Sequence, residues 1–570
     1  MLLYALVAFP PIRDYDYGFH LATGRWIAQH GEVPRTDVFS YSARGARYVD
    51  AHWLFQRALH ALHGAAGHGA NRVAAGLCVL ALLGVVAARG RARSAGAWTI
   101  VGAGLLLVAL APRILVRPEI VSFPLLAAVI ALLQRHDERG GNAVLAVVPL
   151  QLLWANVHGL FAVGLACAAC AAVAELLRVR ASGEPLRRGH LARLLFVLGA
   201  SAASALLNPN GVDAALQPLQ QLGMIGPAGE RSVFGVAIAE LQPTLAAGAS
   251  ALGPLPLGAT ALLVVLAVLG LAGARPGERA QGAVLLAVFG GVALTAVRNV
   301  PLLAIVAALV LVRHAGATAS APGVLRGALR ATAVLAALLL ASVAALLGLG
   351  HWRLRDGPRM ASSPHLADFH FPERAVDWIG RERPPGPLYH RLGDGGWLMW
   401  RLGPEQPVLI DGRLEVYGPE LYARLELLGD DPAAAFGRMD ARWRFGSALV
   451  TYSLFPDLTL LGWLHAQPDW RLAWLDEVAA VFVRVGAGDD AGRFPPVDPT
   501  DPALFPPLDP AHAGHPLDTW RRRTRVRVWA ALGHPRAALD LARETLALGP
   551  DPELAKLLPW LEDRAKRSAR

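Results

Sequence analysis

The chain has 570 residues, of which 54% are hydrophobic and 17% are charged, and its mean hydropathy is positive. These values exclude an ordinary soluble globular protein and a disordered one, and they predict a polytopic α-helical membrane protein. The formal net charge is +10, but the arginines are spread over many short loops rather than gathered in one stripe with aromatic residues, so no nucleic-acid partner is expected.

Apolar stretches in the first 350 residues predict about eleven transmembrane helices. Residues 1–11 would rise only about 16 Å as a helix. We expect them to be the end of a span whose start lies upstream, because a basic region and a cleavage site typical of a signal peptide are absent. The other predicted spans are residues 72–88, 96–111, 119–134, 142–157, 159–177, 191–207, 258–274, 281–297, 300–313 and 331–349.

Arginine-rich and arginine-poor loops alternate along these spans, as the positive-inside rule requires. The basic loops, which we place in the cytoplasm, carry Arg89, Arg91, Arg93, Arg135, Arg139, Arg178, Arg180, Arg187, Arg188, Arg193, Arg275, Arg279, Arg313, Arg326 and Arg330. The opposite, exterior face then receives residues 12–71, 112–118, 156–159, 208–257, 298–299 and everything after residue 350. Most of the unusual polar residues fall on this exterior face.

Residues 12–71, called the first loop below, predict two amphipathic helices around a turn-rich segment. The first helix covers residues 17–30 and is ended by Gly31. The second covers residues 51–65, with Asp50 as its N-cap.

Two carboxylates, Asp14 and Asp16, stand at the mouth of a predicted span, with His20 four residues after Asp16. Ionisable residues near the membrane are candidates for function because their burial is costly. Such a carboxylate acts as a general base on a sugar hydroxyl, or a pair of them binds a divalent cation. The alternative is a solvated loop in which Asp16 caps the helix.

Three arginines at exterior span ends, Arg113, Arg117 and Arg298, are candidates for binding a phosphate group, because the planar guanidinium fork matches phosphate oxygens. The alternative is snorkelling to lipid headgroups. His158 lies in a break between two spans and either donates a hydrogen bond to phosphate or sugar or satisfies backbone carbonyls. Glu240 lies in the exterior segment 208–257, whose Gly and Pro content indicates a lid or an acceptor-binding segment.

After residue 350 the apolar runs give way to short mixed elements, which predict a small α/β domain over residues 360–485. Helices are expected at residues 372–381 and 458–467, strands at 388–390, 407–410 and 448–452, a hairpin of 470–474 with 479–485, and either type at 396–402. Residues 486–515 are rich in Pro and Asp and predict a linker.

Residues 516–570 predict a helical hairpin that resembles one tetratricopeptide unit, with a helix that ends near Gly549. One such unit cannot bury its own face, so it is expected to dock on the neighbouring domain or to bind a protein partner.

Several motifs on the exterior side resemble those of one known group. They are Asp16-x-x-x-His20-Leu21-x-x-Gly24, Gly31-x-x-Pro34-Arg35-Thr36-Asp37-x-Phe39-Ser40-Tyr41, Gly45, His52-Trp53-Leu54, Arg117-Pro118, Trp154-x-Asn156-x-His158-Gly159, Asn208-Pro209-x-Gly211 and Glu240. The pattern covers most of residues 12–310 and resembles bacterial membrane proteins of the GT-C glycosyltransferase superfamily.

This resemblance implies a GT-C-like membrane fold in the bacterial inner membrane and an acidic catalytic residue in the first loop, with Asp16 leading and Asp14 second. It also implies a polyprenyl-phosphate-linked sugar as donor and a lipid, glycan or protein as acceptor, with His20, His52, His158 and Glu240 among the substrate-binding positions. The family places aromatic residues between the Asp and the His, whereas this chain has Gly18. No resident cofactor is implied with certainty, and paired aspartates fit both metal binding and metal-free base catalysis.

Two motifs of the C-terminal domain, Asp394-Gly395-Gly396-Trp397 and Asp411-Gly412-Arg413, resemble the exterior tail domain that accompanies the same family. They fit either simple turns or recognition of a sugar or a partner.

Two other classes of function stay open on the sequence. A transporter or lipid-glycan flippase would use the same polar residues, although no convincing inverted repeat is visible and the charges gather at one face. A non-catalytic envelope scaffold would bind through its C-terminal domains. Both lead to the same test, replacement of Asp16 and Asp14.

Overall fold

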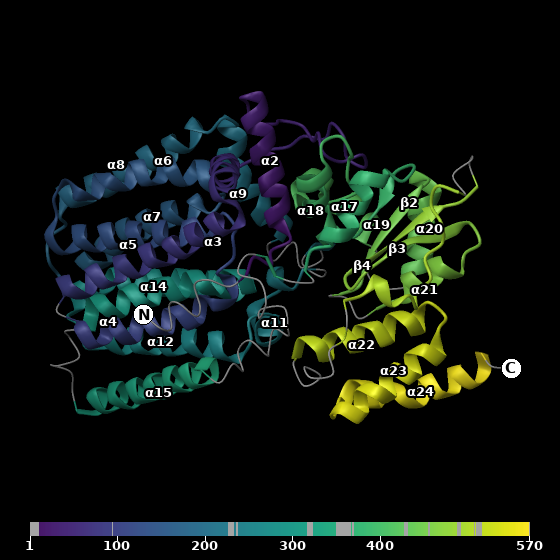
Figure 1. The fold of residues 1–570 in the computed structure, drawn as a ribbon. Coiled ribbons are helices and arrows are strands. Elements are labelled where there is room, and N and C mark those ends of the chain that lie inside the picture. Colours follow the sequence, from purple (N-terminus) through teal and green to yellow (C-terminus); the bar gives the residue numbers. More distant parts are fainter. Residues whose placement is uncertain are drawn as a thin grey trace. The chain divides into compact units, whose positions relative to one another are not determined.

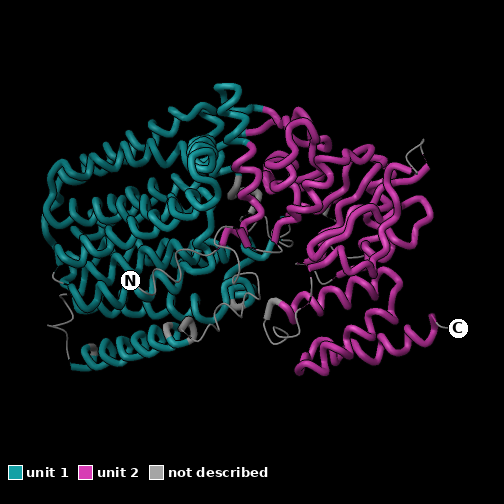
Figure 2. The backbone as a smooth tube through the Cα atoms, in the orientation of Figure 1, with its two compact units in different colours: residues 1–10, 23–35, 49–349 teal, residues 11–22, 36–48, 350–570 magenta. Residues whose placement is uncertain are grey.

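The structure is a computed structural model, which describes residues 11–93, 95–225, 233–234, 238–315, 323–348, 366–367, 370–426, 431–453, 457–486, 492–506, 508 and 516–568. The chain forms two compact units, coloured teal and magenta in Figure 2. Unit 1 comprises residues 1–10, 23–35 and 49–349, and unit 2 comprises residues 11–22, 36–48 and 350–570. The predicted half-span before residue 11 lies outside the described residues.

The elements of regular secondary structure in the described residues of unit 1 are all helices (Figure 1). Its α-helices are α3 (Trp53–Ala92), α4 (Gly96–Leu110), α5 (Glu119–Arg139), α6 (Val147–Val157), α7 (Phe161–Ser182), α8 (Arg188–Ser204), α9 (Gly211–Ile225), α11 (Thr244–Ala251), α12 (Pro254–Ala272), α13 (Pro276–Thr295), α14 (Val300–His314) and α15 (Gly323–Gly348). Short 3₁₀ helices cover η1 (Ala111–Arg113), η2 (Asn142–Ala146), η3 (Ala205–Leu207), η5 (Ala239–Leu241) and η6 (Val297–Asn299).

Eight helices in the described part of the chain are long and apolar enough to cross a membrane. This confirms a multi-pass membrane protein, although the predicted number of about eleven spans is only approximate. The predicted span 142–157 is divided between η2 and the short α6. The predicted span 281–297 largely coincides with α13. The span that contains α14 is 83% buried, against 22% for the span in α15, so α14 packs at the centre of the bundle against α4, α5, α12 and α13.

The first loop forms two helices, as predicted, but they begin at Asp16 and Trp53 rather than at residues 17 and 51. α2 (Asp16–His30) ends at Gly31, whose φ is 73° and whose N–H donates to the Ile27 carbonyl at 2.9 Å. The second predicted helix continues into the first span as α3, with a kink at Gly67. The N-cap prediction for Asp50 is wrong, because α3 begins at Trp53 and the Asp50 carboxylate accepts from the His52 amide at 2.9 Å instead.

Unit 2 is built on one mixed sheet with the strand order β1-β2-β4-β3. Its strands are β1 (Leu388–Tyr389), β2 (Ser447–Thr451), β3 (Trp470–Leu475) and β4 (Ala479–Arg484). The first pair is parallel and the others are antiparallel. The helices around it are α17 (Glu373–Glu382), α18 (Leu392–Leu402), α19 (Leu414–Glu426), α20 (Pro432–Trp443) and α21 (Thr459–Ala466). This confirms the small α/β fold.

The predicted strand at residues 407–410 is wrong, because this segment does not join the sheet. Its backbone partners come from the first loop: the Val408 N–H donates to the Phe39 carbonyl at 2.9 Å, and the Tyr41 N–H donates to the Val408 carbonyl at 3.0 Å. Apolar residues in this segment are therefore buried by non-sheet contacts that look the same as a strand in the sequence. Helices α19 and α20 were not predicted.

The C-terminal segment contains α22 (Pro516–Ala531), α23 (Pro535–Leu548) and α24 (Pro552–Ser568), preceded by the short η9 (Pro502–Leu504). α23 packs against both α22 and α24 around buried Val526, Leu539 and Leu554. The predicted single hairpin is therefore incomplete: a third helix adds the apolar surface that one helical pair cannot bury alone.

Candidate functional site

A group of charged side chains in unit 1 comes from η1, α5 and η5 and the turns beside them, and two of its members, Arg113 and Glu119, are buried. Arg113 follows the last turn of α4, and its Nε donates to the Glu119 carboxylate at 3.1 Å. The same guanidinium forms an ion pair with Glu240, whose other oxygen lies 3.6 Å from Arg117. Arg298, in η6, interacts electrostatically with both glutamates. We call Arg113, Arg117, Glu119, Glu240 and Arg298 the arginine–glutamate cluster.

The cluster carries an unbalanced positive charge, since three arginines face two glutamates. Arg113 is shared between both carboxylates. Arg298 makes no hydrogen bond and no ion pair with any residue in the described part of the chain. An arginine held near a cluster but not committed to a carboxylate retains its donors for an anion.

The positive charge of the arginines stabilises the ionised form of the Glu240 carboxyl. Burial alone would raise the pKa of its carboxyl, but the charges of Arg113 and Arg117 outweigh burial and hold the pKa at about 2. Glu240 is therefore ionised at any physiological pH. Glu240 thus brings a residue of the predicted segment 208–257 to Arg113 and Arg117, which lie more than 120 positions earlier in the sequence.

Two histidines line the neighbouring turn of unit 1. His158 follows α6, and its Nδ1 lies 2.8 Å from the Ser122 hydroxyl, which also accepts from the Trp154 indole at 2.8 Å. The His52 ring lies 5.3 Å from the His158 ring.

Both histidines are kept neutral. Burial lowers the pKa of His52 to about 4. Burial, the neighbouring His52 and the charges of Arg298 and Arg113 lower the pKa of His158 well below its usual range. The turn thus presents neutral hydrogen-bonding imidazoles next to fixed positive charge.

We expect the protein to lose stability in mild acid because of His52. Its folded pKa of about 4 lies below the value of about 6.5 in an unfolded chain. Between these values the unfolded chain binds more protons, so stability falls with pH by up to about 2 kcal/mol from pH 7 to pH 5. Thermal unfolding at both pH values should show a smaller difference for His52→Gln than for wild type. His30→Gln, at an exposed position, is the control, and an unchanged difference in His52→Gln would contradict the expectation.

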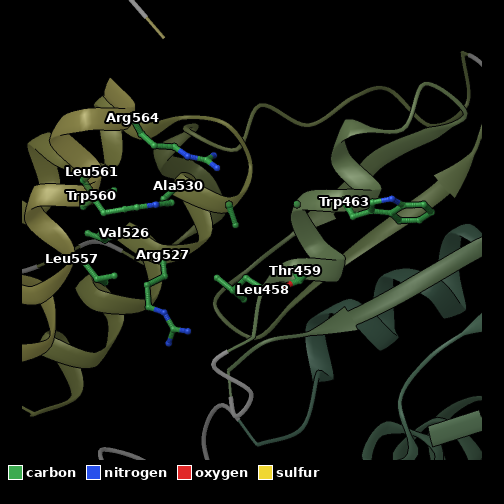
Figure 3. Close-up of a pocket in the computed structure, with 12 residues that line it drawn as sticks. Leu458, Thr459, Trp463, Val526, Arg527, Ala530, Leu557, Trp560, Leu561 and Arg564 are labelled. Carbon is green, nitrogen blue, oxygen red and sulfur yellow. The ribbon is translucent and has the colours of Figure 1, made fainter. Parts of the chain in front are cut away.

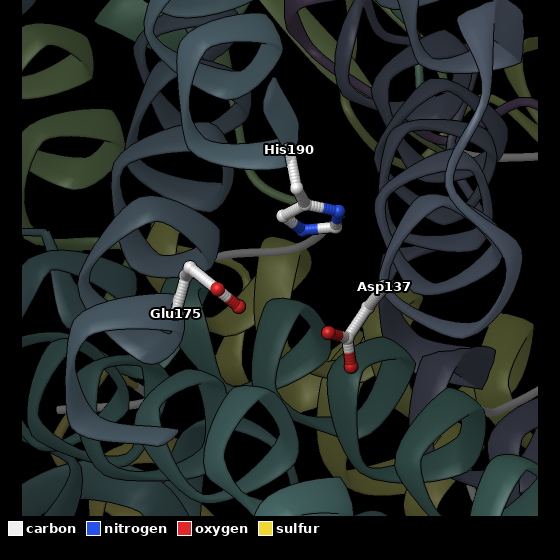
Figure 4. A group of neighbouring side chains, drawn as sticks. All are labelled: Asp137, Glu175 and His190. Atoms are coloured by element: carbon white, nitrogen blue, oxygen red, sulfur yellow. The ribbon is translucent and has the colours of Figure 1, made fainter. Parts of the chain in front are cut away.

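A second polar network lies at the other ends of these spans. Asp137, Glu175 and His190 place ligand atoms within 4.8 Å of one another, a grouping that could hold a metal ion (Figure 4). Both carboxylates, however, bind Arg187, which lies 2.7 Å from Asp137. Arg178 lies 2.9 Å from Glu175, and Arg313 pairs with Asp137. Three guanidinium groups around two carboxylates repel a further cation, so we interpret this network as ion pairs that join helix ends.

The carboxylates predicted from the first loop belong to unit 2. Asp14 is buried, and its Oδ1 accepts from the Asp16 amide at 3.0 Å, so Asp14 supports the start of α2. Asp16 is the first residue of the helix, and its carboxylate lies against Gly412. His20 is buried in the second turn, with its ring 4.1 Å from that of Phe19.

A hollow of about 480 Å³ in unit 2 lies between α21 and the helices α22 and α24 (Figure 3). Its walls include Trp560 and Leu561 of α24, with Arg527 and Arg564 at its edges. The expectation of a protein partner for the C-terminal helices stays a prediction.

Sequence reasoning missed residues on both units. Glu119 was read only as part of a span, although an acidic residue in the first turn of an apolar helix is itself a signal of function. Ser122 carried no such signal, because a serine within a span is common. Asp37 and Arg413, whose side chains lie 2.8 Å apart, could not be paired from a sequence in which they are 376 positions apart.

No protein-family model and no curated protein matches the chain. Among solved structures it is similar to ArnT from Cupriavidus metallidurans in the apo state, with a TM-score of 0.49 and 14% identity over 87% of this chain and 97% of that one. ArnT from the same organism bound to undecaprenyl phosphate gives a TM-score of 0.46 and 14% identity over 85% and 96%. The oligosaccharyltransferase of Archaeoglobus fulgidus in the apo form gives 0.48 and 11% over 78% and 66%.

Proposed function

We propose that the protein is a membrane glycosyltransferase, which moves a sugar from a polyprenyl-phosphate-linked donor to a lipid, glycan or protein acceptor. We place the reaction at the exterior face of the bacterial inner membrane, with the C-terminal domain on the same side. The observation that carries the proposal is the surplus positive charge of the arginine–glutamate cluster at the ends of membrane spans.

A departing lipid phosphate needs charge that is already in position. As the bond between the sugar and the phosphate breaks, negative charge grows on the phosphate oxygens. Donors fixed before the reaction stabilise that charge without reorganising. Arg298 is suited to this role because it pairs with no carboxylate in the part of the chain that the structure describes, and the neutral imidazole of His158 lies within reach of its charge.

Asp16 is the proposed general base, as the resemblance implies. It would take the proton from the acceptor hydroxyl, whose oxygen then bonds to the anomeric carbon while the phosphate leaves with the electrons of the broken bond. Asp14 is proposed to support this group, since it holds the Asp16 amide. The pair also fits a divalent cation, so the same assay is to be run with and without a chelator.

Substitution of Asp16 by asparagine tests the function. In membranes supplied with a panel of radiolabelled polyprenyl-phosphate sugars, we expect wild type to transfer label from one of them. Asp16→Asn at matched expression should lose at least about 100-fold in rate, since general-base catalysis is worth this much. An exposed arginine variant, Arg275→Gln, is the control for expression and handling.

The alternatives predict different results. If wild type transfers no label while a known transferase does so in the same panel, the protein is a lipid-glycan transporter or a scaffold. If wild type and Asp16→Asn transfer equally, the enzyme class stands but Asp16 is not its base.

A further inference from the structure

We infer that Gly412, in the C-terminal domain, is a positioning residue for Asp16, so that this domain is part of the catalytic device; the inference rests on the proposed function. All the contacts that carry it lie within unit 2, which contains residues 11–22, 36–48 and the C-terminal domain. The Asp-Gly-Arg turn is thereby given a role beyond turning the chain.

Gly412 leaves room for the Asp16 carboxylate. A Cβ at position 412 would overlap the Oδ1 of Asp16, lie 3.2 Å from its Cγ and lie 2.9 Å from the Phe19 ring. Any larger residue would have to displace the carboxylate or the aromatic ring. The absence of a side chain at 412 therefore leaves the space that the Asp16 carboxylate occupies.

Two further glycines, Gly18 and Gly396, bring α2 close enough for this contact. A Cβ on Gly18 would overlap the backbone of Gly396, and a Cβ on Gly396 would lie 2.6 Å from the Tyr15 carbonyl oxygen. The first turn of α2 thus packs backbone to backbone against α18. This explains the glycine that departs from the family pattern between Asp16 and His20: an aromatic residue at position 18 would push the helix away.

Buried charge fixes the turn itself. Arg413 is fully buried, and its guanidinium lies 2.6 Å from the Asp411 carboxylate and 2.8 Å from that of Asp37 in the first loop. It also lies over the rings of Phe39 and Tyr48, 5.0 and 5.2 Å from their centroids. The Asp-Gly-Arg turn is therefore joined to both halves of the first loop, at Asp16 through Gly412 and at Asp37 through Arg413.

The Asp-Gly-Arg turn affects catalysis because it restrains the position and orientation of the Asp16 carboxylate. A general base must lie within hydrogen-bond reach of the proton that it takes, and a misplacement of about 1 Å can cost about 100-fold in rate. Gly412 itself does not touch the acceptor. It acts through Asp16, whose carboxylate occupies the space beside it.

The first experiment measures coupling between the two positions without any activity. Thermal midpoints are compared for the full-length protein in detergent with Gly412→Ala, with Asp16→Ala and with both changes. We expect Gly412→Ala to lower the midpoint by several degrees in the wild-type background and by less than half as much when Asp16→Ala has removed the overlapping carboxylate. An equal fall in both backgrounds would overturn the inference.

The second experiment separates positioning from mere stability. At matched amounts of folded protein, Gly412→Ala should lower the turnover number by about 100-fold, shift the acidic limb of the pH profile and leave the KM for the donor unchanged. Gly437→Ala is the matched control, because a Cβ there meets no atom within 4 Å. If Gly412→Ala does not fold, Asp37→Asn is used, which weakens the ion pair with Arg413 without adding a heavy atom. An unshifted pH limb with full turnover in the folded variant would overturn the inference.

The two proposals fail differently. If the thermal midpoints show coupling but wild type transfers no sugar, the contact between Gly412 and Asp16 is confirmed and the proposed enzymatic function is refuted. The catalytic role of Gly412 is then refuted with it. If sugar transfer depends on Asp16 but the thermal midpoints show no coupling, only the inference about Gly412 is refuted.

Discussion

Arg298→Gln is expected to lower kcat/KM for sugar transfer by about 100-fold or more, which is the usual cost of removing one fixed donor from a developing anion. Arg298 is the member of the arginine–glutamate cluster that pairs with no carboxylate in the described part of the chain. Its removal therefore leaves the Arg113–Glu119 ion pair in place. The measurement is the initial rate of label transfer at several donor concentrations.

Two variants make this result specific. Arg298→Lys keeps the charge but loses the planar fork, so its activity should lie between those of wild type and Arg298→Gln. Arg275→Gln removes an exposed arginine from the start of α13 and should leave the rate unchanged. Full activity of Arg298→Gln would contradict this role and favour the alternative that the arginine interacts with lipid headgroups.

Asp411→Ala is expected to destabilise unit 2 by about 3–5 kcal/mol, because it leaves most of a buried guanidinium without its partner. Asp411 binds Arg413 through both carboxylate oxygens, at 2.7 and 2.6 Å, and it accepts from the Tyr417 hydroxyl at 2.6 Å. Asp37 alone then remains to balance Arg413. The measurement is the unfolding free energy or the thermal midpoint in detergent.

The same variant has an expected pH signature. Burial tends to raise the pKa of Asp411, but the charge of Arg413 outweighs it and lowers the pKa below its usual value. A depressed folded pKa gives stability that is present above the unfolded value of about 3.9 and is lost as the pH falls further. Wild type should therefore lose this contribution below about pH 4, whereas Asp411→Ala has none to lose.

The control is an ion pair at the surface of the same domain. Asp377 pairs with Arg401, but its side chain is 46% exposed, so Asp377→Ala should cost no more than about 1 kcal/mol. Similar losses for Asp377→Ala and Asp411→Ala would contradict the role given to burial.

Local signals predicted most of the elements in both units. Gly31 ends α2 because a residue without Cβ adopts a positive φ at low cost. The hairpin of β3 and β4 follows from alternating apolar residues, and the spans follow from their length and apolarity. The strand predicted at residues 407–410 failed because burial against the first loop leaves the same apolar pattern as burial in a sheet.

The sequence alone thus determined the membrane class, the α/β character of the C-terminal domain and the polar residues that stand at span ends, because periodicity, hydropathy and charge are local properties. Only the tertiary structure decided that Glu240 neutralises part of the arginine–glutamate cluster, that Arg298 does not share in that pairing, and that Gly412 lies against Asp16. Contacts between residues hundreds of positions apart depend on how helices pack and on which glycines allow close approach, and neither leaves a local pattern in the chain.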